Sequence, residues 1–180
     1  MFTGINLRSI PAAKAREETA TENLIACHQR IRHFTAIARR IAESNDAPPE
    51  QVADAAADLH RYFYVALPLH EADENVSIDP RIEAAVPGTE AAQASKEMVR
   101  QHLDIRAVLN SLLPLWDALC REPEKLSSFS PRLLVLSNRL EKLWDAHLKL
   151  EEEIVFPAME KYLSAQEKEE ILREMRERRR

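Results

Sequence analysis

Residues 70–74 of the chain read HEADE, and residues 147–151 read HLKLE. Each stretch places a histidine and a glutamate four residues apart, about one helical turn, so both side chains project from the same face of a helix. Each stretch also ends a stripe of apolar residues, and we therefore expect that face to point into the core. Because burying an unpaired carboxylate is costly, a metal ion is one of the few partners that would compensate it.

The composition indicates one folded, helical domain. With 180 residues, 45% of them hydrophobic, the chain is long and apolar enough to bury a core, which excludes a disordered protein. Its two glycines are fewer than a sheet protein with many tight turns usually needs. Cys27 and Cys120 lie far apart without a CxxC pair, which excludes a thiolate zinc motif and a disulfide framework. We expect Cys27 to be a small buried residue that points away from the direction of His28.

Charge and hydropathy argue against two classes of partner. The net charge of −5 gives no reason to expect nucleic acid. No signal peptide is evident, and no apolar run approaches the roughly 20 residues of a membrane span. We therefore expect a cytoplasmic protein with neither a nucleic-acid nor a membrane partner. The arginine-rich end, residues 176–180, is interpreted as a solvated helix terminus.

Apolar periodicity and turn residues predict an all-α protein, an antiparallel up-down four-helix bundle with a short C-terminal extra helix. We expect long helices at about residues 21–43, 50–75, 89–121 and 130–157, with kinks at Pro68 and Pro114 and a kink or end at Pro157. Ser130 and Pro131 have the order of a helix start, so residues 123–129 are expected to form a loop and residues 76–88 the longest connection. Ser164 and Glu167 form a capping box before the last helix.

The same patterns divide the chain into three parts. Residues 1–16 are expected to be a flexible lead-in, residues 17–163 the bundle, and residues 164–180 a polar C-terminal helix.

One inward histidine is expected on each long helix. An interior histidine on its own is more often a hydrogen-bonded core residue than a ligand, but the two stretches repeat at a constant spacing of 77 residues and add two inward glutamates. Imidazole together with carboxylate favours iron, manganese or zinc over calcium or magnesium. His33 is expected on the surface, and His60 is expected to be a partly exposed structural residue near Tyr64. The candidate metal ligands are His28, His70, Glu74, His102, His147 and Glu151.

The sequence resembles the hemerythrin-like (HHE cation-binding) domains over most of its length. The six candidate ligands carry this resemblance, together with the stretch HLKLEEEIVFP at residues 147–157. The resemblance implies a bridged centre of two iron ions held by the six candidate ligands, with manganese or zinc as alternatives. Some members also use the glutamate after the second histidine, here Glu71. Glu152 is a further second-tier candidate, although we expect it, with Glu153, to belong to the solvated face. Oxygen-carrying members have a further histidine where this chain has Arg106, a change that favours a more open iron site or an extra carboxylate.

Three functions follow as expectations from the resemblance and the site. The first is a di-iron protein that senses, binds or handles oxygen, nitric oxide or iron, with a small diatomic ligand or peroxide as partner. The second is an enzyme, a di-iron reductase of peroxide or oxygen. The third is a regulatory adaptor controlled by iron occupancy, with the last helix as the candidate surface for a protein partner.

Overall fold

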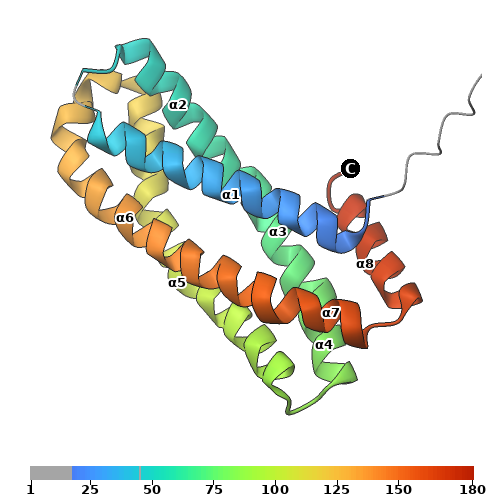
Figure 1. The fold of residues 1–180 in the computed structure, drawn as a ribbon. Coiled ribbons are helices and arrows are strands. Elements are labelled where there is room, and N and C mark those ends of the chain that lie inside the picture. The colour runs from blue at the N-terminus through green and yellow to red at the C-terminus, as the bar shows by residue number, and fades with distance from the viewer. Residues whose placement is uncertain (1–17, 45) are drawn as a thin grey trace, which may run out of the picture.

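The computed structural model describes residues 18–44 and 46–180, so the predicted lead-in lies outside the described residues. Within them the chain is helical without strands, and four long helical rods run alternately up and down, with a fifth helix beside them (Figure 1). This confirms the all-α bundle with an extra helix. The first rod is α1 (Ala20–Glu43), and the third is α5 (Glu90–Arg121). The second rod consists of α2 (Pro49–Arg61), η1 (Tyr62–Ala66), α3 (Leu67–Ala72), η2 (Asp73–Ile78) and α4 (Asp79–Ala85). The fourth consists of α6 (Leu126–Leu150), η4 (Glu151–Val155) and α7 (Phe156–Tyr162), and the fifth helix is α8 (Ala165–Glu177).

The segments η1, η2 and η4 are short stretches of π-helix inside the second and fourth rods. Each is followed, two residues after its end, by a proline: Pro68, Pro80 and Pro157. A proline lacks its N–H and its ring collides with the carbonyl four residues earlier, and the wider π turn accommodates this without ending the helix. Pro157 is therefore accommodated in the helix rather than ending it.

Two predicted boundaries are wrong. The second rod runs to Ala85, so only residues 86–89, including Gly88 with its φ of 75°, connect it to α5. The fourth rod begins at Leu126, and Ser130 donates a hydrogen bond to the Leu126 carbonyl rather than capping a helix. The reason is that residues Pro123–Lys125 already form a 3₁₀ turn that starts with proline, which supplies the first turn of the rod.

Other helix starts follow the sequence closely. Thr89 caps α5, accepting a hydrogen bond from the Ala92 N–H, as the prediction of a start near Thr89 requires. The predicted capping box of Ser164 and Glu167 is confirmed at the start of α8. No helix in the described part of the chain is long and apolar enough to cross a membrane.

Apolar side chains gather in two clusters, one in each half of the bundle. The first surrounds Trp116 and Trp144 between α1, α2, α5 and α6. The second lies at the other end of the rods and includes Ile171 and Met175 of α8, which thereby packs against the bundle. The division into a bundle and a separate C-terminal unit stays a prediction. On each rod, the candidate ligands lie between residues of the first cluster and residues of the second, so they form a polar layer across the core.

Candidate metal centre

The six candidate ligands converge in this polar layer. They come from all four rods, and none is more than 3% exposed. They form two groups that share both glutamates, and the ligand atoms of each group lie within 4.8 Å of one another. One group contains His28 and His70, and the other contains His102 and His147. Each group thus offers two imidazoles and two carboxylates to one ion.

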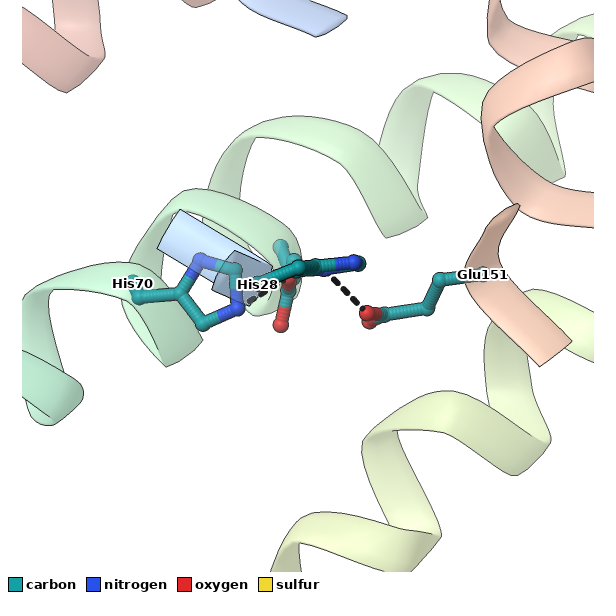
Figure 2. Close-up of side chains that lie close together, drawn as sticks. His28, His70 and Glu151 are labelled. Atoms are coloured by element: carbon teal, nitrogen blue, oxygen red, sulfur yellow. Dashed lines mark ion pairs between the residues drawn. The ribbon is translucent and has the colours of Figure 1, made fainter. Parts of the chain in front are cut away.

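Each glutamate lies between two imidazoles. The carboxylate oxygens of Glu74 are 3.0 Å from His70 Nε2 and 3.1 Å from His102 Nε2. Those of Glu151 are 2.9 Å from His28 Nε2 and 3.2 Å from His147 Nε2. In Figure 2, His28 and His70 meet from neighbouring helices, and a dashed line joins His28 to Glu151.

The surroundings of the buried carboxylates show that this donor set fits a metal pair. Glu71, Asp73, Glu74 and Glu151 are all fully buried. Glu71 is paired with an arginine and Asp73 with two, whereas among the described residues Glu74 and Glu151 form ion pairs with histidines alone. In the described structure no oxygen of Glu74 or Glu151 has a hydrogen-bond partner, and neither has His28 Nε2. Buried acceptors in this state are costly unless a cation binds them.

Polar groups on the far side of three imidazoles hold the rings in place. The Nδ1 of His28 lies 2.7 Å from Glu152 Oε1, and Arg32 donates to both oxygens of the same carboxylate. The Nδ1 of His102 lies 2.9 Å from Asn75 Oδ1, and that of His147 lies 3.1 Å from Gln101 Oε1. When each Nδ1–H donates to these oxygens, Nε2 is left unprotonated and free to bind a metal.

His70 has a thiol beside it in place of an oxygen acceptor. Cys27 is buried, as predicted, but it lies next to His70 rather than pointing away from the site, and Arg30 Nη2 lies 3.0 Å from its sulfur. Burial raises the pKa of Cys27, but the neighbouring His70 and Arg30 outweigh burial and lower it.

The charges inside the cluster shift three pKa values, those of His70 and Glu74 most strongly. Burial lowers the pKa of His70, but the Glu74 carboxylate, with Cys27 and Glu151, outweighs burial and raises it well above its ordinary value. The pKa of His102 is raised in the same way, by Glu74 against burial. Burial raises the pKa of Glu74, but His70 and His102 outweigh it and hold it well below the usual range. In the metal-free chain the charged forms of Glu74, His70 and His102 therefore stabilise one another.

The two additional candidate ligands make other contacts. Glu71 is ion-paired with Arg106, so the arginine at the position of the absent histidine neutralises a buried carboxylate. The Glu152 side chain is 30% exposed, and its carboxylate forms ion pairs with His28 and Arg32. Neither belongs to the two groups of converging ligand atoms. As predicted, His33 is exposed, and His60 is partly exposed with its ring stacked on Tyr64.

Sequence reasoning missed several residues around the centre. Asn75 and Gln101 each adjoin a candidate ligand along the chain, and this adjacency is the signal that could have found them. The interpretation of residues 176–180 as a solvated terminus is wrong for Arg178 and Arg179, which bind the buried Asp73. No local pattern in the sequence connects these arginines with an aspartate about a hundred residues earlier.

We expect Glu152→Ala to weaken metal binding by about 10- to 100-fold, the usual effect of removing a group that orients a ligand imidazole. Without Glu152, His28 loses the acceptor that fixes its ring and its proton. Titration with ferrous iron against a competing chelator measures the loss. Glu153→Ala is the matched control, because Glu153 is the next residue and its side chain is 64% exposed. An equal loss in both variants would contradict the orienting role.

Metal affinity is expected to rise with pH. Because the pKa values of His70 and His102 are raised in the metal-free chain, protons compete with a metal ion for these imidazoles more strongly than for an ordinary histidine. The raised pKa of His70 has the opposite effect on the metal-free fold: its contribution is present below the ordinary histidine pKa and is lost as pH rises through the raised one. Iron titrations and thermal unfolding at about pH 6 and about pH 8.5 test both trends. An affinity that falls over this range would contradict the assignment.

A comparison with known families agrees with this geometry. The family model described as the hemerythrin HHE cation binding domain matches residues 19–159 and, in a second match, residues 94–180. No curated protein sequence matches the chain significantly.

Proposed function

Because the chain belongs to the hemerythrin HHE cation binding domain family, we propose that it is a non-haem di-iron protein that senses, binds or handles oxygen, nitric oxide or iron. One observation carries the proposal: two fully buried glutamates lie between four imidazoles and form no ion pair with an arginine or lysine among the described residues. Two divalent ions would replace the protons on His70 and His102 as the positive charge beside these carboxylates.

The donor set is compatible with iron, with manganese and zinc as alternatives. Mixed imidazole and carboxylate ligands suit iron, manganese and zinc, whereas calcium and magnesium prefer oxygen donors alone. The ligands of each group come from three rods, and the two groups together include all four, so a pair of ions would also tie the bundle together. We propose His28, His70, Glu74, His102, His147 and Glu151 as the ligands.

The number of donors leaves room for a small molecule. Each group provides two imidazoles and two shared carboxylates, fewer than the six ligands of an octahedral ion. Bound iron would supply the capacity to bind and reduce a diatomic molecule or peroxide. The protein would orient the ligands through Glu152, Asn75 and Gln101 and would exclude bulk water from the layer between the apolar clusters.

Metal analysis and optical spectroscopy test the proposal together. Protein purified from iron-supplied cells should contain about two irons per chain, and the iron should absorb visible light. Less than about one iron per chain, without such absorption, would refute it. Spectra recorded reduced under nitrogen and then in air identify the function, since a reversible change indicates oxygen binding and irreversible bleaching indicates iron loss or chemistry.

The reductase alternative stays a prediction and has a separate test. The iron-loaded chain should consume peroxide in the presence of a reductant, and His147→Ala should abolish the turnover. Equal turnover in the variant would exclude this centre as the site of the reaction. The adaptor alternative is favoured by a specific contact of α8, described next.

A further inference from the structure

The residue before the candidate ligand Glu74 is held by the end of the chain. Asp73 is fully buried in η2, and its partners are two arginines just beyond α8. Arg178 Nη1 donates to Asp73 Oδ1 at 2.8 Å, and Arg179 Nη2 donates to Oδ2 at 2.6 Å. Arg179 Nη1 makes a further contact with Oδ1 at 3.2 Å. Removal of both guanidinium groups would leave a buried carboxylate uncompensated, so Asp73 ties η2 closely to α8.

A second set of contacts joins the same two elements. Ser77, also in η2, is buried, accepts a hydrogen bond from Arg178 at 2.6 Å and donates one to Glu174 of α8. Glu174 in turn binds Arg81 of α4 at 2.7 Å. Polar contacts from α8 thus reach η2 at Asp73 and at Ser77, on either side of the turn that carries the centre's glutamate.

Apolar contacts complete the docking of α8. Ile171 and Met175 are buried in the second apolar cluster together with Ile78, the last residue of η2, and Ile82 of α4. In Figure 1, α8 lies along the side of the bundle near the start of α1 and the lower part of the second rod. Its place against η2 is therefore built from buried side chains as well as from charges.

We propose that α8 is a latch for the metal centre, with Asp73, Arg178 and Arg179 as positioning residues that couple its docking to metal binding through the segment carrying Glu74. The inference rests on the proposed function. Asp73 adjoins Glu74 in η2, so the docked arginines and a bound metal would both act on the same short segment. A metal on Glu74 and the arginines on Asp73 would each favour the arrangement described here.

Coupling of this kind is reciprocal. If docking of α8 raises metal affinity by some factor, metal binding must favour docking by the same factor. Such factors are about 5- to 150-fold in typical proteins. Loss of metal would therefore release α8 and change the surface at this end of the bundle, which would make the metal state detectable outside the core.

Two measurements on the full chain test the latch. Hydrogen exchange by mass spectrometry, with and without ferrous iron under nitrogen, should show exchange in α8 slowed by about 5- to 150-fold on metal binding. In the double variant Arg178→Gln/Arg179→Gln, iron affinity should fall by the same factor and exchange in α8 should no longer respond to iron. Lysine at both positions should restore part of the affinity, because the charges on Asp73 return.

Controls separate the latch from general stabilisation. Arg173→Gln lies in the same helix, at an arginine with no recorded ion pair in the described structure, and should behave as the parent chain. Exchange in α2, at the other end of the bundle, should be the same in the double variant as in the parent. If iron binds but exchange in α8 does not change, or if the double variant binds iron as tightly as the parent, the latch is refuted while the proposed function stands. If the parent chain takes up no iron, both are refuted.

Discussion

Glu74→Gln should abolish the binding of both ions, with an affinity loss of more than about 100-fold. Removing a residue that only hydrogen-bonds to a metal ligand already costs about 10- to 100-fold in affinity. Glu74 belongs to both groups of ligand atoms, and its two oxygens face His70 and His102. An amide keeps the shape of the side chain but loses the negative charge and one of the two acceptor oxygens. The loss should therefore reach both ions. Iron content and titration with ferrous iron measure it.

Two further variants sharpen this test. Glu151→Gln should have the same effect, because Glu151 occupies the equivalent place between His28 and His147. Glu153→Gln should leave binding unchanged, since that side chain is mostly exposed. One ion retained per chain in Glu74→Gln would show that the two groups bind independently, contrary to the shared carboxylates.

Removing the metal should lower the unfolding temperature by about 10 to 20 °C. With free metal at about 100 times Kd, each site adds about 2.7 kcal/mol to the free energy of unfolding, so two sites add about 5 kcal/mol. In a chain of this length, 1 kcal/mol shifts the midpoint by about 2 to 4 °C. The physical reason is that the metal-free chain keeps two carboxylates and four imidazoles buried in its middle. Calorimetry of the iron-loaded chain before and after chelation gives the shift.

The glutamate variant also controls for the chelator. Glu74→Gln, which should hold no iron, should unfold at the same temperature with and without chelator. An unchanged midpoint in the parent chain after complete removal of iron would mean that the metal contributes nothing to the fold.

The convergence of the six candidate ligands could be predicted from sequence because helical phase determines it. His28, His70, His102 and His147 each continue an apolar stripe, and all four prove buried at the same level of the bundle. Helix boundaries were less predictable. Residues 79–85 contain Pro80, which is typical of a connection, but the π turn before it lets the helix continue.

Contacts between distant segments could not be predicted at all. The pairing of Glu71 with Arg106 depends on the register between the second rod and α5. The pairing of Asp73 with Arg178 and Arg179 depends on where α8 docks. In both cases a charged side chain has the same sequence signature whether it faces solvent or a buried partner, so only the packed structure distinguishes them.

The polar layer between the two apolar clusters also bears on cooperativity. A core that is interrupted by charge across its full width can open in parts, and the end that contains α8 can unfold sub-globally while the other end keeps its packing. Both tryptophans, Trp116 and Trp144, belong to the cluster at the other end. Intrinsic fluorescence would then follow only the last stage of denaturation, and the midpoint it reports for the metal-free chain would exceed the one reported by circular dichroism.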